Sequence, residues 1–516
     1  MSSNISQIDM VNDFVNQMKN NGNKIQEEMM EKFIKQMNDD FTITLIKEGH
    51  LENRVMLSDS YKYSHVDAYE DDISSMFDYA EARSGKVFKD TKFFGLQYYL
   101  KKYFEKPITQ YEVDEAKKYA DAHGIRFDKK GWDYIVNDLK GMLPVRIKAV
   151  REGSLVPVKN VLFTMESTDE RVFWIASWLE TILMKVWLPC NVATRSHFIK
   201  ETLMEYAMRT SDNPFVDYTL HSFGDRGSSS VESAGIGGMA HLTSFMGTDN
   251  FNAMRYVNIF YGTDINRIGH SIAALEHSTV TSWGKENEYE MFLNFMEKNK
   301  GNPIVAFVMD SYDYFKSVET VTSDPRFTEK INSDEYPIFV MRPDSGDPMD
   351  IVPKTIDIME KNNVPFTVNS KGFKVWNKMR IIWGDGISEQ AIIDMCDLLV
   401  ERGYSTENIA FGMGGALMQG NETTSNNRDT QAFAIKNSSV TYVDGNKRDV
   451  FKDPITAPNK KSKKGELTLW RNPTTNEYIT DRVDAKPTGF EDSLHIVYEN
   501  GLIVKEWTFD EVREAA

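Results

Sequence analysis

Five short apolar runs in this sequence each lead into a polar loop that contains glycine, and no other feature limits the possible folds so strongly. Between the runs lie segments of helical spacing, such as Ser388 to Arg402, which stops at Gly403. This alternation is typical of βα units. We therefore predict an α/β fold with a (β/α) barrel-like core built from these five segments: His221-Ser-Phe-Gly-Asp-Arg-Gly227, Ile304-Val-Ala-Phe-Val-Met-Asp310-Ser-Tyr-Asp313, Ile338-Phe-Val-Met-Arg342-Pro-Asp344-Ser-Gly346, Arg380-Ile-Ile-Trp-Gly384-Asp385-Gly386 and Ile409-Ala-Phe-Gly412-Met-Gly414-Gly415.

The loops that follow these runs carry His, Arg, Asp and Gly. In (β/α) barrels the reacting groups lie on the loops at the carboxyl ends of the strands. Glycine lets backbone N–H groups approach a phosphate, Arg binds it through two parallel hydrogen bonds, and Asp can hold a hydrated divalent cation or a developing positive charge. The pattern therefore predicts a site for a phosphorylated, Mg²⁺-chelated ligand.

The chain divides into four regions that differ in how their apolar and polar residues are spaced. Residues 51–190 are predicted to form a mixed α/β domain, 191–420 the barrel-like catalytic domain, and 421–516 a β-rich segment that packs back on the mixed domain. Residues 1–50 are predicted to form a helical extension, because their apolar residues recur at helical spacing at Ile8, Val11, Phe14, Val15 and Met18.

Individual elements outside the core are also predicted. Gln110 to Ala122 is expected to be helical, and Val145–Val150 and Val161–Met165 are expected to be strands. A β-hairpin is predicted from Leu494 to Trp507, because Asn500-Gly501 suits a type I′ turn.

The composition limits the kinds of partner and the cellular compartment that we expect for this protein. The net charge of −17 argues against a nucleic-acid partner. The only cysteines, Cys190 and Cys396, have no metal-ligand spacing and are expected to be reduced core thiols. No apolar run is long enough to cross a membrane, and the N-terminus lacks the pattern of a signal peptide. We therefore expect a cytoplasmic protein without a membrane partner.

Ten short motifs occur in one order from about Leu57 to the C-terminus. Together they resemble those of the nicotinamide phosphoribosyltransferases, a type II phosphoribosyltransferase family. The resemblance implies transfer of the phosphoribosyl group of phosphoribosyl pyrophosphate to nicotinamide, giving nicotinamide mononucleotide and pyrophosphate in NAD salvage. The motifs are Asp59-Ser-Tyr-Lys62, Phe94-Gly-Leu-Gln97, Gly131-Trp132, Phe223-Gly-x-Arg-Gly227, Ala234-Gly-Ile-Gly237, Gly247-Thr-Asp249, Glu276-His-Ser-Thr279, Arg342-Pro-Asp-Ser-Gly346, Gly384-Asp-Gly386 and Phe451-Lys-Asp-Pro454.

The resemblance implies how the base is bound. The pyridine ring would lie between Phe223 and Tyr61 of the partner subunit, so the site would lie at the interface of a homodimer. Asp249 would accept a hydrogen bond from the carboxamide and repel the carboxylate of nicotinate. Taken alone, a Phe such as Phe223 in a loop is more often a core residue, and Asp249 could cap a helix that starts near Asn250.

The resemblance also assigns residues to the phosphate groups and the ribose. Backbone N–H groups at Gly384, Asp385, Gly414 and Gly415 would bind the 5-phosphate. The remaining substrate-binding residues, some of them contributed around the dimer interface, would be Arg226, Ser271, His277, Arg342, Pro343, Arg428, Arg83, Lys436, Lys452 and Lys460.

Catalysis would depend on electrostatic stabilisation. The transition state should carry positive charge on the ribose, which Asp344 and Asp310 would stabilise, with Asp313 as a further candidate. Mg²⁺ would be carried by the pyrophosphate near Asp310 and Asp344, without a side-chain cluster of its own. In this family His277 would in addition be phosphorylated by ATP, which makes ATP a coupled co-substrate.

Two other functions remain open at this point. A nicotinate or quinolinate phosphoribosyltransferase would run the same class of reaction on an acid but should lack the Asp249 arrangement. A catalytically silent homologue would bind nicotinamide nucleotides as a sensor, and it would be favoured if His277, Asp344 or Arg342 were missing. All three are present.

Overall fold

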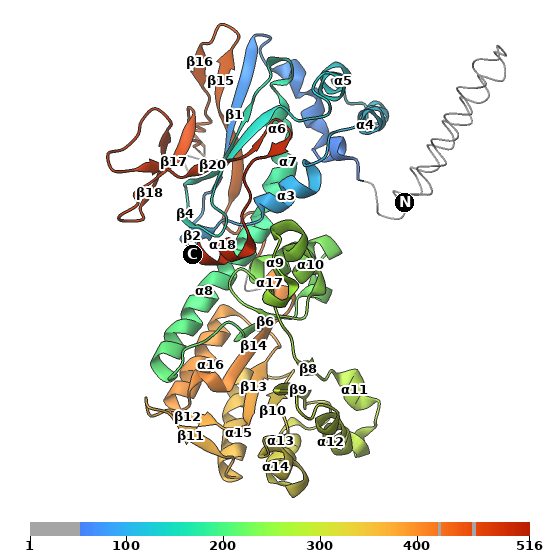
Figure 1. Ribbon diagram of the computed structural model, residues 1–516, viewed down its shortest axis with the longest axis vertical. Helices are drawn as coiled ribbons and strands as arrows, with labels where there is room; N and C mark the ends of the chain where they lie inside the picture. Colours follow the sequence, from blue (N-terminus) through green and yellow to red (C-terminus); the bar gives the residue numbers. More distant parts are fainter. Residues whose placement is uncertain (1–51, 422–424, 457–460, 516) are drawn as a thin grey trace, which may run out of the picture.

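The computed structural model describes residues 52–421, 425–456 and 461–515. The helical extension predicted for residues 1–50 lies outside this part of the chain. Two seven-stranded sheets dominate the described residues, one parallel and one antiparallel. Figure 1 shows them at opposite ends of the molecule, with the long helix α8 (Trp187–Thr210) running from the middle of the molecule along the parallel sheet.

The parallel sheet has the strand order β7-β6-β14-β13-β10-β9-β8. Its strands are β6 (Leu220–Ser222), β7 (Gly247–Thr248), β8 (Ala273–Ala274), β9 (Ile304–Val308), β10 (Ile338–Arg342), β13 (Met379–Trp383) and β14 (Ile409–Met413). A parallel bridge between Gly247 of β7 and His270, just before β8, joins the two edges. The sheet therefore curls into a barrel-like ring, which confirms the predicted fold class.

Helices connect successive strands of this sheet, and a last one, α17, follows β14. The helical segment predicted from Ser388 to Arg402 is α16: the Ser388 hydroxyl caps it by accepting from the Ala391 N–H, and Arg402 follows the last helical residue. The helices are α9 (Val231–His241), α10 (Phe251–Tyr261), α11 (His277–Thr281), α12 (Glu288–Lys298), α13 (Tyr314–Ser323), α14 (Pro325–Ile331), α15 (Pro348–Lys361), α16 (Glu389–Glu401) and α17 (Gly415–Gln419).

The long parallel strands are buried on both faces. On the inner face a small apolar cluster of Ala306, Val340 and Ile382 fills the ring, and Phe223 packs against it. The other face contributes Val305, Phe307 and their neighbours to the main core. Burial on both faces explains why these strands appear as continuous apolar runs.

The antiparallel sheet combines strands from both ends of the chain. Its order is β16-β15-β1-β5-β3-β20-β21. Tyr79 in the middle of β1 is paired with Lys436 on one side and Thr164 on the other. The strands are β1 (Ile73–Ala82), β3 (Val145–Val150), β5 (Val161–Ser167), β15 (Phe433–Tyr442), β16 (Lys447–Asp449), β20 (Leu494–Glu499) and β21 (Leu502–Ile503).

Local signals explain the elements around this sheet. Thr109 and Glu112 form a capping box at the start of α4 (Gln110–His123). Asn500 and Gly501 both have positive φ, 49° and 88°, as a type I′ turn requires, so the predicted hairpin is confirmed. The other elements here are α3 (Leu96–Tyr103), α5 (Lys129–Asn137), α6 (Ile175–Trp178), α7 (Glu180–Leu183), α18 (Phe509–Glu514) and the short strands β2 (Asp90–Lys92), β4 (Leu155–Pro157), β17 (Leu467–Arg471), β18 (Tyr478–Arg482) and β19 (Glu491–Asp492).

Four C-terminal strands, β15, β16, β20 and β21, thus lie in the same sheet as β1, β3 and β5, whereas β17, β18 and β19 form a separate three-stranded sheet. The exact boundaries proposed at residues 50, 190 and 420 stay predictions. Among the helices of the described residues, none combines the length and apolar character needed to cross a membrane.

Candidate active site

The predicted reacting residues follow the carboxyl ends of successive parallel strands. Phe223 follows β6, Asp249 follows β7, His277 begins the helix after β8, and Asp310 and Asp344 follow β9 and β10. Carboxyl ends of parallel strands meet at one edge of the sheet, so the fold gathers residues that are far apart in the sequence.

The ring of Phe223 lies where two glycines leave space for it. The backbone N–H of Phe223 donates to the carbonyl of Met413 at 2.9 Å, and this bond holds the start of the loop after β6 against the end of β14. A Cβ atom on Gly412 would lie 1.9 Å from Cε2 of Phe223, and one on Gly384 would lie 3.2 Å from it. Glycine at these two positions therefore leaves space for the Phe223 side chain at the carboxyl ends of the parallel strands.

Asp249 is held through one of its two carboxylate oxygens. Oδ1 lies 2.9 Å from Nε2 of His221 and also accepts from the Ser271 hydroxyl. No hydrogen bond to Oδ2 occurs within the described part of the chain. Asn250, and not Asp249, caps α10 by accepting from the Ala253 N–H, so Asp249 is not used as a helix cap.

The surroundings of Asp249 favour its ionised form. Burial alone would raise the pKa of this carboxyl group, but the hydrogen bonds from His221 and Ser271 and the positive charge of Arg342 lower the pKa below its usual value. Because the carboxylate is an acceptor, Nε2 of His221 is the donor. Asp249 therefore presents a negatively charged oxygen without a hydrogen bond in the described residues, and its partner His221 in turn contacts the Phe223 ring, with centroids 5.1 Å apart.

A second cluster joins His277 to two carboxylates. Nε2 of His277 lies 3.0 Å from Oδ1 of Asp310, and Nδ1 lies 3.8 Å from Oδ2 of Asp344. The same Asp344 oxygen is 3.4 Å from Nη2 of Arg342. The imidazole is half exposed, whereas Asp310 is buried. The arrangement orients one ring nitrogen through a carboxylate and leaves the other facing an ion pair.

Asp310 has little capacity left for a metal ion. Its Oδ2 accepts from the backbone N–H of Asp344 at 3.2 Å and from the hydroxyl of Ser345 at 2.5 Å, while Oδ1 faces His277. Within the described residues no group of three or more His, Cys, Asp or Glu could hold a metal ion. Asp344 has fewer partners, since its Oδ2 faces Nδ1 of His277 and Nη2 of Arg342, so of the two carboxylates Asp344 is the one able to face a cation. Asp313 caps α13 by accepting from the Lys316 N–H, so its side chain has a structural partner.

Several buried polar atoms near these clusters lack a partner. They are Nε of Arg342 and the hydroxyls of Ser222 and Ser311. Such groups are normally paired in native proteins, so an unpaired set next to the strand ends indicates atoms that a ligand could bind. Arg342 is followed directly by Pro343, which cannot donate a backbone hydrogen bond.

The glycine-rich loops pack against each other. A Cβ atom on Gly227 would lie 2.7 Å from Cα of Gly415, so the loop that carries Arg226 touches the loop after β14. Asn426 donates to the carbonyl of Met418 at 2.7 Å, which brings the segment before Arg428 to the same place. Arg226 and Arg428 are both exposed there. In the loop after β13, Trp383 Nε1 donates to the carbonyl of Asp385 at 2.6 Å, which fixes the Gly384-Asp385 backbone.

Other predicted residues lie on the antiparallel-sheet half. Tyr61 is 57% exposed on a short 3₁₀ helix, Ser60–Ala68, and its ring packs edge-on against His65. Arg83 donates to the carbonyl of Ala432, Lys436 lies on β15, and Lys452 is exposed. No hydrogen bond, ion pair or ring contact joins these four to Phe223, Asp249 or His277 in the described chain. Lys460 lies outside the described residues.

Two functional candidates were not predicted. His221 orients Asp249, and Ser345 helps to orient Asp310. A signal for His221 existed: it lies on β6 two residues before Phe223, which follows the strand directly, and side chains two apart in extended chain share a face.

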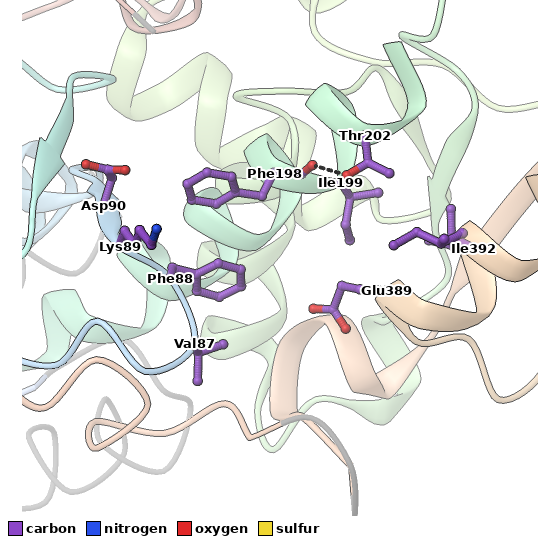
Figure 2. A pocket seen from close by; sticks show the side chains of 10 residues that line it. Val87, Phe88, Lys89, Asp90, Phe198, Ile199, Thr202, Glu389 and Ile392 are labelled. Atoms are coloured by element: carbon purple, nitrogen blue, oxygen red, sulfur yellow. Dashed lines mark hydrogen bonds between the residues drawn. The ribbon is translucent and has the colours of Figure 1, made fainter. Parts of the chain in front are cut away.

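A pocket of about 360 Å³ lies elsewhere, between the 87–90 loop, α8 and α16. Figure 2 shows Phe88 and Phe198 there, with stacked rings whose centroids are 5.4 Å apart, and Glu389 nearby. Glu389 pairs with the buried Arg195 at 2.8 Å. None of the predicted site residues lines this pocket, so it is separate from the chemistry described above.

Two family models match parts of this chain, and known proteins are similar to it along most of its length. Residues 218–502 match the model of the nicotinate phosphoribosyltransferase (NAPRTase) family, and residues 53–147 match the nicotinamide phosphoribosyltransferase N-terminal domain. The chain is 43% identical to a nicotinamide phosphoribosyltransferase of Xanthomonas campestris over 90% of this chain and 98% of the relative. It is 31% identical to one of Acinetobacter baylyi over 72% of this chain and 76% of the relative.

Solved structures share the fold at low sequence identity. Nicotinate-nucleotide pyrophosphorylase of Pyrococcus furiosus aligns with a TM-score of 0.56 and 15% identity, covering 90% of this chain and 94% of that one. Human nicotinic acid phosphoribosyltransferase aligns with a TM-score of 0.50 and 14% identity, covering 89% and 92%.

Proposed function

The chain belongs to the nicotinamide phosphoribosyltransferases of the nicotinate phosphoribosyltransferase family, and we propose that it transfers the 5-phosphoribosyl group of phosphoribosyl pyrophosphate to nicotinamide. The products would be nicotinamide mononucleotide and pyrophosphate, as required in NAD salvage.

The observation that carries the choice of base is the free oxygen of Asp249. His221 and Ser271 both occupy Oδ1, so Oδ2 is left to accept a hydrogen bond from the carboxamide NH₂ of nicotinamide. Nicotinate would bring a second negative charge to the same place. Because the lowered pKa of Asp249 keeps it ionised at neutral pH, the acid would be rejected by repulsion.

The remaining residues supply positioning and charge. The Phe223 ring would stack on the pyridine and direct its nitrogen at the anomeric carbon, which needs no general base. As the bond to pyrophosphate breaks, Asp344 would stabilise the positive charge that develops on the ribose. Arg342, with its unpaired Nε, would bind the departing phosphate oxygens. Mg²⁺ would supply further charge neutralisation when it is bound to the pyrophosphate.

We further propose that ATP phosphorylates His277. A carboxylate at Asp310 accepts from Nε2, so the lone pair is left on Nδ1, the nitrogen on the Asp344 side. Nδ1 would attack the γ-phosphorus of ATP as the bond to the ADP oxygen breaks, and water would later hydrolyse the phosphohistidine. The buried Asp310 would compensate the positive charge that forms on the imidazole.

The position of Tyr61 favours a homodimer. A second aromatic wall is needed opposite Phe223, yet Tyr61 is exposed and has no contact with that site within its own chain. In a homodimer the partner subunit's Tyr61 would supply this wall.

A direct assay tests the proposed function. The purified protein is incubated with phosphoribosyl pyrophosphate, Mg²⁺ and either nicotinamide or nicotinate, with and without ATP, and the mononucleotide is quantified. We expect product from nicotinamide and a higher yield with ATP. Product from nicotinate alone would overturn the assignment of the base and favour an acid-specific enzyme, and no product from either base would favour a silent homologue.

A further inference from the structure

A second pocket, lined mainly by charged and polar side chains, lies against α8 and shares no lining residue with the pocket at the 87–90 loop. It has a volume of about 800 Å³, within the usual range for small-ligand sites. None of the residues of the candidate active site lines it. Its walls are the carboxyl-terminal half of α8, the turn after α9, β2 and α18, and they carry Lys92, His197, Lys200, Glu201, Met204, Glu205, Met208, Arg209, Thr243, Ser244 and Arg513.

Lys92 is the unusual residue of this pocket. Its side chain is only 2% exposed, and no carboxylate within the described residues pairs with it. Its ammonium donates only to the Thr243 carbonyl at 3.2 Å and the Ser244 hydroxyl at 3.3 Å. Both acceptors belong to residues that line the pocket, so the ammonium lies at its wall. Buried lysines are rarely left without a carboxylate partner.

The other cations of the pocket already have acceptors or ring contacts. Lys200 pairs with Asp217 at 2.7 Å, and the guanidinium of Arg513 donates to the carbonyls of Leu242, Arg267 and Ile268. Arg209 lies over the ring of Tyr206, 5.4 Å from its centroid. Lys200 and Arg513 therefore repel the ammonium of Lys92 electrostatically. No carboxylate in the described residues binds that ammonium and offsets the repulsion.

The remaining ionisable residues do not neutralise Lys92. Burial and the charges of Lys92 and Lys200 lower the pKa of His197 to about 4, so this imidazole is neutral at pH 7. Its buried Nε2 has no hydrogen bond, and the Glu201 carboxylate lies 3.5 Å away without hydrogen-bond geometry. Glu201 and Glu205 are both exposed on α8, where water screens their charge.

We propose that this pocket is a binding site for a small ligand that carries a phosphate or sulfate group, with the ammonium of Lys92 as its main anchor. The oxyanion takes the place of the missing carboxylate, and Met204 and Met208 offer apolar surface for the rest of the ligand. The site is independent of the phosphoribosyl transfer and of its proposed substrates.

Proton uptake gives this proposal a distinctive signature. Burial and the charges of Lys200 and Arg513 lower the pKa of Lys92 to about 7, so part of the population is neutral near that pH. An oxyanion beside the amine favours its charged form. Binding at pH 7.5 should therefore take protons from the buffer.

The test is isothermal titration of the full chain with sulfate, which does not itself titrate near neutral pH. Titrations at about pH 7.5 in two buffers of different ionisation enthalpy measure the protons taken up. Lys92→Met keeps the length of the side chain and removes its charge, and Met204→Trp fills the pocket while keeping the amine. Lys300→Met, which removes an exposed lysine paired with Glu335, is the matched control.

We expect Lys92→Met and Met204→Trp each to weaken the sulfate binding that is linked to proton uptake by about tenfold or more, since hydrogen bonds to charged groups are the strong ones. Lys300→Met should bind as the wild type does. Unchanged affinity in Met204→Trp, or proton uptake that persists in a folded Lys92→Met protein, would overturn the proposal. Sulfate bound only at the active-site arginines would give identical titrations for all variants and would also overturn it.

Discussion

The imidazole of His221 lies 2.9 Å from the carboxylate of Asp249, Nε2 to Oδ1, and this contact decides which oxygen of Asp249 is available to a base. The Ser271 hydroxyl binds the same oxygen. A substrate therefore meets an acceptor whose direction is already set. Preorganised hydrogen-bonding groups of this kind contribute more than flexible ones, since no further ordering is needed on binding.

Asp249→Asn should change the choice of base. We expect kcat/KM for nicotinamide to fall roughly 10- to 100-fold, because a hydrogen bond to a charged acceptor is worth about 1.5–3 kcal/mol. Nicotinate should gain relative to nicotinamide, since the repelling charge is removed. The measurement is kcat/KM for both bases. Asp334→Asn, at the opposite end of β10, serves as the control and should leave the ratio unchanged.

His277→Ala should abolish the effect of ATP while the ATP-independent reaction continues. The wild-type chain should take up label from ATP labelled at the γ-phosphate in an acid-labile, alkali-stable form. His277→Ala should take up none. Asp310→Asn should reduce the labelling rate by about a hundredfold or more, the usual range for a residue that assists proton and charge transfer. Equal labelling of all three proteins would exclude a phosphohistidine at this position.

Gly412→Ala should disturb the base site through packing. The new Cβ atom would lie 1.9 Å from the Phe223 ring, so the ring must move. We expect an increase in KM for nicotinamide and a loss of about 1–3 kcal/mol in the free energy of unfolding, which is typical of overpacking. Steady-state kinetics and urea unfolding measure the two effects. A variant with wild-type KM would show that the ring position does not matter.

The buried His241 should make stability depend on pH. Burial and the charge of His221 lower the pKa of His241 to about 3, although its hydrogen bonds oppose this, and its Nδ1 lies 3.0 Å from the Ser196 hydroxyl. Between pH 6.5 and 3 the unfolded chain binds a proton that the folded chain does not. The contribution of His241 to the free energy of unfolding therefore decreases as the pH falls, by about 2 kcal/mol between pH 7 and pH 5.

His241→Gln removes this titration while its amide can still bond to Ser196. The free energy of unfolding of the variant, measured in urea at pH 7 and pH 5, should fall less than that of the wild type. Parallel losses in the two proteins would show that His241 is not the group responsible.

Mixing two inactive variants tests the shared site. Tyr61→Ala and Phe223→Ala should each be nearly inactive alone. If each site uses Phe223 of one subunit and the partner subunit's Tyr61, mixed dimers regain one intact site. After random exchange of subunits, activity should return to about a quarter of the wild-type value. No recovery after proven exchange would place both residues in a site within one chain.

The sequence pattern predicted the strands that are buried on both faces but not the shortest ones. β9, β10, β13 and β14 appear as apolar runs because neither face meets water. β7 and β8 consist of only Gly247–Thr248 and Ala273–Ala274, so they carry no periodic signal. Their place in the ring depends on pairing with distant strands, which local patterns do not contain.

In the candidate site, too, some features follow from local sequence patterns and others depend on contacts between distant residues. The strand-end rule predicted that Asp310 and Asp344 lie together, because the rule follows from the topology of the sheet. It could not predict that Asn250 caps α10 while Asp249 remains available, since either residue suits a helix start. The partnership of His221 with Asp249 depends on the pairing of β6 with β7, and the two residues are 28 positions apart.

Strand β1 pairs with β15, a strand that is synthesised much later than β1. Ile73 of β1 is aligned with Tyr442 of β15, so the centre of the antiparallel sheet joins segments that leave the ribosome far apart in time. Until residues 433–442 have been synthesised, β1 presents an open edge that can pair with a neighbouring chain. The parallel sheet, whose strands lie between residues 220 and 413, can form before this edge is covered. During translation β1 must therefore wait for β15, and in that interval its open edge can recruit another unfinished chain.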